Sequence, residues 1–392
     1  MRILQNQGRY TIFQPKDNLC DQLRLTEEFG RTCYQSYECK ACNNTGEIQN
    51  NVLGTNPGAE KFLCPKCNGT GKRTISNESA IKFFKMIEKR GHESVFEHIP
   101  IVFEMEIPWD KAYIDKDWNS EEIWQELATA MNYIVGLHFS RETNDQRLVT
   151  TWTFSMNLRT LRDWVMAPCN SVLSRFIYGC ILEACPTMVE GLSPEKIVTC
   201  GWGEGFNYQL LSQTDVLAHP DTWYREMHGY MTVRFSDVSR GFTHELVRHR
   251  LCAFSQESTR YVDEKESAIV APPEISVDEG WGLQQKHTHP SFRELGNNAF
   301  AAYQSLQKRG WPKEDARQIL PIGLANEIVC TANLKEWIWI MKMRTSHTAH
   351  WEIRFMMIQV LQELQKLYPG LFNSFVIDGH DKKGIPHYQY QE

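Results

Sequence analysis

The segment VRHRLCAFSQESTRY, residues 247–261, concentrates three arginines and a histidine beside a run of hydroxyl and amide side chains. Apolar Leu251, Ala253 and Phe254 stand among these polar residues. A solvated surface has no need of the apolar residues, and a buried strand does not tolerate unpaired arginines. We therefore expect the segment to hold an anion in a partly enclosed place, with its apolar residues packed against the core.

The composition of the whole chain is that of a soluble globular protein. The chain has 392 residues, of which 42% are hydrophobic and 23% charged, and its net charge is −6. This length permits one large domain or two ordinary ones, and the negative charge argues against a general nucleic-acid coat. No apolar run approaches the ~20 residues that span a bilayer, and the N-terminus lacks the apolar core of a secretory signal. We expect a cytosolic (cytoplasmic) protein.

Four of the twelve cysteines form two matched pairs. Cys39-Lys-Ala-Cys42 and Cys64-Pro-Lys-Cys67 are each followed by a turn that contains glycine. Two such knuckles can present four thiolates tetrahedrally, and the polar stretch between them cannot bury a core of its own. We therefore predict a structural zinc module over residues 39–75, similar to the CxxCxGxG knuckles of DnaJ-type zinc domains. Four unliganded thiols on a loop are the alternative.

The other eight cysteines are scattered along the chain. Without a secretory signal we expect them to be reduced, and most of them to be small core residues. They are Cys20, Cys33, Cys169, Cys180, Cys185, Cys200, Cys252 and Cys330.

The first half of the chain contains recognisable helix and strand patterns. A cap at Ser76 or Asn77 begins a predicted helix that ends at Gly91. Alternation of apolar and acidic residues over 101–107 predicts a half-buried strand. A capping-box sequence predicts a helix over 119–137.

The second half is described by two further patterns. Residues 231–235 predict a strand, and Ser236 or Asp237 is expected to cap a helix over 238–249. A stripe of apolar residues predicts one long core helix over 334–367.

The region from about residue 108 to 230 is harder to interpret. One segment in it, NLRTLRDW (157–164), weakly resembles NLKEWIWI (333–340) near the end of the chain. Chance explains this likeness about as well as duplication does.

Several separated motifs together resemble the flavin-dependent thymidylate synthases. RHRLCAFSQESTRY (248–261) is similar to the signature of that family, usually written RHRxxSxxxxSxRY. VSRGFTHELV (238–247), GHESVFEH (91–98) and the opening RTCYQS (31–36) also resemble the family. Downstream, residues 316–354 resemble its C-terminal nucleotide-binding region. These matches cover about half of the chain in the expected order.

The resemblance implies an α+β fold in which an antiparallel sheet packs against helices, with a long C-terminal core helix. The catalytic domain would comprise residues 1–38 and 76–392, with 108–230 as an extended region and 39–75 as the zinc-binding insertion. The implied reaction is the reductive methylation of dUMP to dTMP. Methylenetetrahydrofolate would supply the carbon, and reduced FAD, regenerated by NADPH, the hydride. The family shares its active sites between the subunits of a homotetramer, so a homotetramer is expected here.

The resemblance also assigns site residues, on partly overlapping sets of positions. Arg344 would be catalytic. The positions that would bind dUMP are Glu245, Leu246, Val247, Arg248, Gln256, Glu257, Ser258, Thr259, Arg260, Arg317 and Arg344. The positions that would bind the flavin cofactor are His98, Arg248, His249, Arg250, Gln256, Asn333, Leu334 and Lys335.

These residue types suit the implied chemistry. A nucleotide phosphate removed from water needs charge-assisted hydrogen bonds, which Arg248, Ser258 and Arg260 can supply. A fixed positive charge such as Arg344 beside the pyrimidine would stabilise the negative charge that develops when its C6 accepts a nucleophile. The plainer alternatives are surface ion pairs for the arginines, a structural role for His98, and a solvated helix face for Arg344.

The sequence departs from the family pattern at two positions. Ala253 replaces the first serine of the signature, so no chemical role is expected there. Trp339 stands where some relatives carry a polar flavin contact, so that contact is not transferred. His347 and His350 have a spacing that could ligate a metal, but no third ligand is evident.

Three rival functions remain open. The nearest is another folate-dependent enzyme that modifies C5 of a pyrimidine nucleotide, a hydroxymethylase or a dCMP methylase. A thymidylate synthase with a nucleophilic cysteine is weaker, because Cys169 in APCN lacks the histidine that follows it in such motifs. A non-catalytic protein that docks a partner through its zinc knuckles would leave the arginine-rich loop unexplained.

Overall fold

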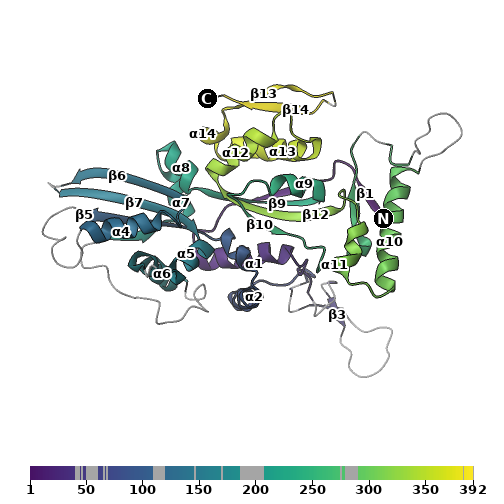
Figure 1. Cartoon of the computed structure of the whole chain (residues 1–392), viewed down its shortest axis with the longest axis horizontal. Coiled ribbons are helices and arrows are strands. Elements are labelled where there is room, and N and C mark those ends of the chain that lie inside the picture. Colours follow the sequence, from purple (N-terminus) through teal and green to yellow (C-terminus); the bar gives the residue numbers. More distant parts are fainter. Residues whose placement is uncertain are drawn as a thin grey trace.

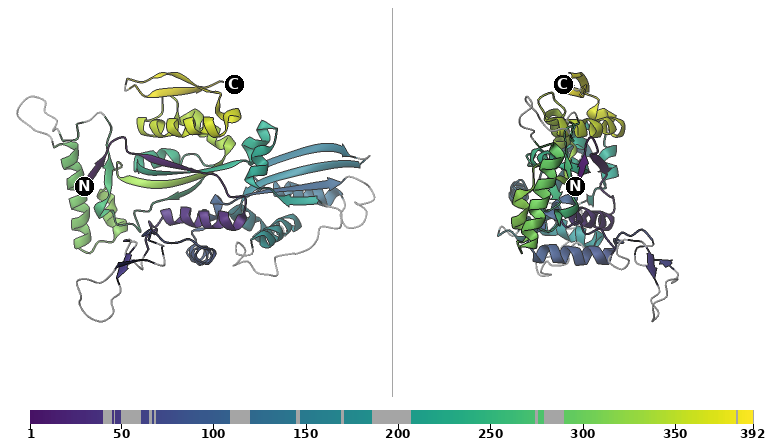
Figure 2. Two further views of the ribbon diagram at one scale, coloured as in Figure 1. Left: turned by 180° about the vertical axis from the view of Figure 1, so that it is seen from behind. Right: turned by 90° about the vertical axis from the view of Figure 1, so that its right-hand side faces the viewer.

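The computed structural model describes most of the chain, and Figure 1 shows its arrangement. The described residues are 1–39, 45, 47–49, 61–64, 67, 69–108, 120–144, 147–168, 171–185, 207–273, 276–278, 290–382 and 384–391. Within them, two four-stranded antiparallel sheets follow one another along the long axis of the molecule, with helices packed on them (Figures 1 and 2). The predicted α+β class is therefore confirmed.

The central sheet has the strand order β10–β12–β9–β2. Its strands are β10 (Ala253–Gln256), β12 (Ala325–Asn333), β9 (Tyr230–Ser239) and β2 (Arg9–Phe13). Met231, Val233 and Phe235 of β9 are fully buried, and Tyr230 and Thr232 between them are buried as well, so the start of this strand is covered on both faces. The predicted strand over 231–235 is therefore present and extends further in both directions.

Three helices cover the core face of the central sheet. They are α9 (Arg240–Leu246), α12 (Leu334–Arg344) and α13 (Trp351–Leu367). Phe242 and Leu246 of α9 join Trp337 of α12 and Met357 of α13 in one cluster of buried side chains with the strands. This cluster is the core that carries the arginine-rich segment.

The prediction of a single helix over 334–367 is wrong, because the chain breaks between α12 and α13. In the break, the Arg354 guanidinium donates to the backbone carbonyls of His347 and Ala349, both at 3.0 Å. These carbonyls are held in a turn, so they do not continue a helical ladder. Arg344 therefore lies in the last turn of a helix, not in the middle of one.

Helix α1 (Leu19–Thr32) lies on the other side of the central sheet, with α2 (Asn77–Lys89) beyond it (Figure 1). The 3-10 helix η1 (Glu93–His98) contacts β10. The predicted cap of α2 is confirmed, because the Ser76 hydroxyl accepts the backbone N–H of Ser79 at 3.2 Å. Gly91 follows the end of this helix with φ +68, a conformation that favours glycine.

The second four-stranded sheet, called the distal sheet, has the order β6–β7–β5–β8. Its strands are β6 (Gly136–Asn144), β7 (Arg147–Asn157), β5 (Pro100–Pro108) and β8 (Asn207–Leu210). Helices α4 (Ser120–Ala130), α5 (Leu158–Met166) and α6 (Val172–Ala184) contribute buried side chains to the same core as these strands. The strand predicted over 101–107 is β5, but Val102 is buried as well as Ile101 and Phe103, so this part of the strand is not half-buried as predicted.

The prediction that a helix continues to residue 137 is wrong, because α4 ends at Ala130. By Val135 the chain has joined the distal sheet, donating its N–H to the carbonyl of Ser155 at 2.8 Å. Gly136 begins β6 directly opposite Ser155. A Cβ atom added at Gly136 would lie 2.5 Å from the Ser155 hydroxyl oxygen, so the close approach of these strands requires glycine.

The predicted cap at Ser236 or Asp237 is also wrong. β9 continues to Ser239, whose hydroxyl accepts the Phe242 N–H at 3.0 Å and so caps α9. The register of β9 with β12 shifts near Asn326, which lengthens the strand beyond the simple alternation. The helix predicted over 238–249 is consequently the shorter α9.

Smaller elements complete the fold. β1 (Arg2–Leu4) pairs in parallel with β11 (Ala268–Val270). Two further pairs are antiparallel: β3 (Glu47–Gln49) with β4 (Lys61–Leu63), and β13 (Phe375–His380) with β14 (Pro386–Tyr390). The remaining helices are α7 (Gln213–Ala218), α8 (Thr222–His228), η4 (Glu264–Glu266), α10 (Phe292–Lys308), α11 (Lys313–Ala316), η5 (Arg317–Ile319) and α14 (Pro369–Phe372). In the described part of the chain, no helix is both long and apolar enough to cross a membrane.

One prediction about the scattered cysteines is corrected. Cys20, at the start of α1, and Cys185, at the end of α6, form a disulfide, so these two residues are not reduced. Cys252 and Cys330 are buried in the core, as predicted. Cys169 and Cys200 lie outside the described residues.

The core beneath the arginine-rich segment is expected to depend on Phe242 and not on Leu251. Phe242 is fully buried, so Phe242→Ala should lower the free energy of unfolding by about 3–5 kcal/mol. Leu251, predicted above to pack against the core, is 70% exposed, so Leu251→Ala is the control and should change that free energy by less than about 0.5 kcal/mol. Urea unfolding of both variants measures this, and equal losses would contradict the assigned packing.

Candidate functional site

The first part of the site lies at the C-terminal end of α9, where Arg344 contacts the arginine-rich segment. The Arg344 guanidinium donates to the Glu245 carboxylate at 2.8 Å and to the Glu245 backbone carbonyl at 2.7 Å. Its Nε lies 3.0 Å from Nε2 of His249. The solvated helix face considered for Arg344 is therefore wrong, because this side chain is tied to two predicted site residues.

Burial lowers the pKa of Arg344. The neighbouring Glu245 carboxylate raises this pKa, and the positive charge of Arg248 lowers it. Arg344 and Arg248 are therefore close enough to repel each other, and an anion between them would relieve that repulsion. His249 is buried, and its Nδ1 lies 3.5 Å from the Glu336 carboxylate. Arg248 and Arg250, on either side of it, are exposed. The segment thus anchors through its histidine and presents its two arginines to solvent.

The second part lies at the N-terminal end of α9. Arg317 donates to the Thr259 hydroxyl at 2.8 Å. Burial lowers the pKa of Arg240 and the nearby Arg317 lowers it further, while Glu264 and Glu257 raise it. Two guanidinium groups and a hydroxyl therefore gather at this end of the helix, which is a donor set suited to a phosphate.

Sequence reasoning missed Arg240. It lies in VSRGFTHELV, which was used for the resemblance, but only the residues from Glu245 onward were assigned a role there. Five residues of helix separate Arg240 from Glu245, a rise of about 7.5 Å. The two ends of α9 could thus contact different parts of one small anionic ligand.

The residues between the two parts are held by backbone and side-chain bonds. The Gln256 amide donates to the Thr243 hydroxyl at 2.7 Å and to Asn326 at 2.8 Å. Ser258 donates its backbone N–H to the carbonyl of Cys33 at 3.1 Å. The Glu257 carboxylate accepts the backbone N–H of Glu327 at 3.1 Å. The loop is thereby fixed against β12 and the end of α1.

The end of the loop is exposed. Arg260 forms an ion pair with Glu314 at 3.0 Å, as the surface-ion-pair alternative allowed for this arginine. Tyr261 packs against Tyr34, with ring centroids 5.2 Å apart, and against His92 at 6.2 Å. The predicted motifs around residues 31–36 and 91–98 are therefore adjacent to the signature loop in space.

The remaining predicted flavin residues are placed differently from one another. His98 is fully buried, its Nδ1 lies 2.7 Å from Thr331 and its Nε2 lies 3.0 Å from Ser255, so a flavin contact would require the ring to change partners. Burial lowers the pKa of His98 to about 3, which keeps the ring neutral. Asn333 caps α12, and Leu334 is buried. Lys335 is exposed.

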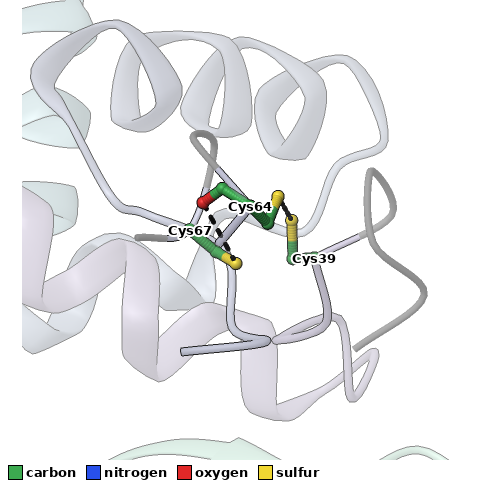
Figure 3. Close-up of side chains that lie close together, drawn as sticks. All are labelled: Cys39, Cys64 and Cys67. Carbon is green, nitrogen blue, oxygen red and sulfur yellow. Dashed lines mark hydrogen bonds between the residues drawn. The ribbon is translucent and has the colours of Figure 1, made fainter. Parts of the chain in front are cut away.

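The cysteine module is partly described. The sulfur atoms of Cys39, Cys64 and Cys67 all lie within 4.8 Å of one another, and those of Cys39 and Cys64 are 3.9 Å apart (Figure 3). A tetrahedral zinc ion with Zn–S bonds of about 2.3 Å places its ligands roughly 3.8 Å apart, so these distances fit. Gly69 and Gly71 have φ +79 and +70, which is the turn geometry predicted for the second knuckle. Cys42 lies outside the described residues.

Two cavities lie beside α1, near the cysteine module. One has a volume of about 570 Å³ and includes Tyr34, Lys82 and Arg90, and the other, about 730 Å³, includes Arg234 and Glu327. Neither is lined by a residue predicted to bind dUMP or flavin. The predicted site therefore lies outside these two cavities.

Residues 221–370 match the model of the Thy1 family, described as thymidylate synthase complementing protein. The matched stretch contains every predicted dUMP-binding position and every predicted flavin position except His98.

Two similar proteins illustrate the relationship. A flavin-dependent thymidylate synthase of Saccharolobus solfataricus is 31% identical over 182 residues, which are 43% of this chain and 65% of that protein. One of Mycobacteroides abscessus is 34% identical over 158 residues, 38% of this chain and 63% of that protein. The chain thus spans a little under two thirds of the length of these relatives. Among solved structures, the UMP/dUMP methylase PolB from Streptomyces cacaoi matches with 23% identity and a TM-score of 0.31, over 38% of this chain and 72% of its own.

The loop should make stability depend on pH through Glu257. Burial, together with Glu264 and Glu327, raises the pKa of Glu257 from 4.5 to about 8. A carboxyl whose pKa is higher in the folded state stabilises the fold fully below pH 4.5, and that contribution is lost as the pH rises to about 8. Relative to wild type, Glu257→Gln should therefore become progressively more stable between these pH values. Urea unfolding across the range tests this, and a pH-independent difference would refute it.

Proposed function

We propose that this protein is a flavin-dependent thymidylate synthase, a methyltransferase that converts dUMP to dTMP with methylenetetrahydrofolate as the carbon donor. The observation that carries the proposal is the contact of Arg344 with Glu245 and His249. It joins two motifs that lie about 95 residues apart in the chain and that the resemblance assigned to one site. The similarity of this part of the chain to the Thy1 family model and to flavin-dependent thymidylate synthases supports the same conclusion.

The nucleotide phosphate is assigned to the second part of the site, at the N-terminal end of α9. Arg317, Thr259 and the nearby Arg240 form its inner donors, and the exposed Arg248 and Arg260 are available to close over it. A dianion bound in this way exchanges its water shell for charge-assisted hydrogen bonds, which also relieves the repulsion between Arg240 and Arg317.

Arg344 is assigned to the pyrimidine. The Glu245 carboxylate and carbonyl both accept from its guanidinium, so its orientation is fixed before the ligand arrives. A preoriented positive charge stabilises the negative charge that develops on the ring at little cost in reorganisation. Glu245 is thus a positioning residue for Arg344 as well as a predicted dUMP contact.

The flavin is assigned to exposed cations that follow α9 and that begin α12. Arg248, Arg250 and Lys335 complement the diphosphate of FAD, while His249 and Asn333 hold the backbone beneath them. When bound, the flavin would supply the hydride, with NADPH as the source of its electrons. We further propose a cytoplasmic homotetramer in which a second chain covers the bound ligands.

The cysteine module is assigned a structural zinc ion held by Cys39, Cys42, Cys64 and Cys67. Four thiolates leave no position for water or substrate, so the ion would stabilise the fold and not take part in catalysis.

Arg344→Ala should separate flavin binding from turnover. Tritium release from [5-³H]dUMP with methylenetetrahydrofolate and NADPH should fall by at least about 100-fold, as when an oriented charge-stabilising group is removed, while the flavin absorbance spectrum is retained. Arg309→Ala, an exposed arginine after α10, is the control and should leave the rate unchanged. Full activity of Arg344→Ala would refute its role, and a colourless wild-type protein would refute the function.

Zinc removal should affect residues 39–75 before the rest of the chain. We expect one zinc ion per chain by elemental analysis, and proteolysis of that segment should accelerate after chelation. Cys64→Ser should abolish the zinc content, whereas Cys180→Ser, in α6, should not. If chelation left the segment equally resistant, the metal assignment would be wrong.

A further inference from the structure

Two buried histidines make the same contact in opposite directions between the two sheets. His98 precedes β5 of the distal sheet, yet its Nδ1 bonds the Thr331 hydroxyl of the central sheet at 2.7 Å. His228 precedes β9 of the central sheet, yet its Nδ1 bonds the Ser155 hydroxyl of the distal sheet at 3.0 Å. Both histidines are fully buried. A reciprocal contact of this kind is expected of two equivalent units related by a two-fold axis.

The strands that follow the two histidines have identical pairing. Pro100 at the start of β5 pairs with Asn157 at the end of β7, and Tyr230 at the start of β9 pairs with Asn333 at the end of β12. Each asparagine then caps the next helix through its side-chain oxygen, which accepts the N–H three residues on, at 2.9 Å in both cases. Thr331 and Ser155 each lie two residues before their asparagine.

The backbone around the caps repeats the match. Leu158 donates its N–H to the carbonyl of Ile99, the residue after His98, at 2.9 Å. Leu334 donates its N–H to the carbonyl of Gly229, the residue after His228, at 2.8 Å. The weak likeness of NLRTLRDW and NLKEWIWI therefore marks equivalent positions in space, which favours duplication over chance.

The first strands of the two units are exchanged. β2 precedes α1, and Gln22 of α1 donates to the His98 carbonyl at 3.0 Å. β8 precedes α7, and Gln213 of α7 donates to the His228 carbonyl at 3.3 Å. β2, however, pairs with β9, and β8 pairs with β5. Each sheet is thus completed by a strand from the other unit.

We infer that the chain is a tandem repeat of one unit, residues 9–184 and 207–367, whose first strands are exchanged, and that the first repeat is a non-catalytic partner of the second. Apart from β3 and β4 in the first repeat, and η4, β11, α10, α11 and η5 in the second, both repeats run in the same order. This order is an exchanged strand, a helical segment ending in the buried histidine, a strand, a helix, two strands and two final helices, which are α5 and α6 in the first repeat and α12 and α13 in the second. The region 108–230, predicted as an extension, contains the end of one repeat and the beginning of the other.

The first repeat lacks the charges of the second. The pairing of β6 with β7 and that of β10 with β12 define equivalent positions in the two repeats. When residues are counted back from these positions without a gap, the equivalents of Arg248, His249 and Arg250 in the first repeat are Met131, Asn132 and Tyr133. Counting forward from the capping asparagine, Pro168 stands in place of Arg344. The Thy1 match, residues 221–370, contains no part of the first repeat and covers the second from α8 onward, without β8 and α7. This part of the inference rests on the proposed function, because it assigns one nucleotide site to each chain.

The buried contacts differ between the repeats in one respect. His98 forms a second hydrogen bond, from its Nε2 to the hydroxyl of Ser255 in the second repeat. In the first repeat, His138 occupies the strand position equivalent to Ser255. Nε2 of His228 has no hydrogen-bond partner among the described residues, and His138 lies 6.5 Å away between ring centroids. The first repeat has thus diverged at the position that supports the signature strand β10 in the second.

Hydrogen exchange of the full chain tests the strand exchange without any ligand. Ser155→Ala removes the partner of His228 from a strand of the first repeat, so hydrogen exchange should accelerate in β9 and β12 as well as in β5 and β7. Thr331→Val, the matched change in the second repeat, should have the mirror effect. Thr129→Ala in α4 is the control and should leave β9 and β12 unchanged. Acceleration confined to the mutated repeat would overturn the inference.

Calorimetric titration of the full chain with dUMP tests the division of roles. We expect one dUMP per chain, with binding weakened at least tenfold by Arg248→Gln and unchanged by Asn132→Ala, its counterpart in the first repeat. Two molecules per chain, or one per two chains, would overturn the non-catalytic role of the first repeat. If wild type bound no dUMP, the proposed function would fail, whereas the hydrogen-exchange result would still decide whether the repeats are exchanged.

Discussion

The antiparallel pairing of β9 with β12 is the constraint on which the candidate site depends. The two strands pair from Tyr230–Asn333 to Ser239–Ala325, so α9, which leaves one end of β9, and α12, which leaves the end of β12, lie on the same core. Arg344 reaches Glu245 and His249 because the two helices are brought together by this register. A slip of one residue would turn the buried side chains of β9 toward the opposite face and separate these groups.

Burial divides the arginine-rich segment into anchors and donors. His249, Cys252 and Ala253 are buried and hold the chain, while Arg248 and Arg250 remain exposed on either side of the histidine. Buried guanidinium groups are costly unless they are paired, so the fold buries the histidine beside Glu336 and leaves the two arginines at the surface. The segment is consequently both part of the core and a source of positive charge, which answers why apolar residues stand among its arginines.

Hydrogen bonds of buried histidines also connect the two sheets. A neutral histidine precedes the first long strand of each sheet and forms a hydrogen bond with a hydroxyl group of the other sheet. A charged side chain in the same place would have to lose its water of hydration, which is more costly. His98 is therefore better explained as a link between repeats than as a surface for a flavin. The repeat explains why residues from distant parts of the chain, such as Tyr34 and Tyr261, meet at one loop.

The sequence by itself located several of the local elements and predicted the chemistry of the site. Alternation located β5 and β9, the Ser76 cap located α2, and the arginine-rich motif located the donors, because each depends on neighbours within a few residues. Tertiary structure decided the rest. The break before α13 is made by Arg354 bonding backwards to the turn, and the role of His98 depends on Thr331, a residue 233 positions away. Contacts between residues so far apart leave no periodic signal, so only the folded chain shows which side chains meet.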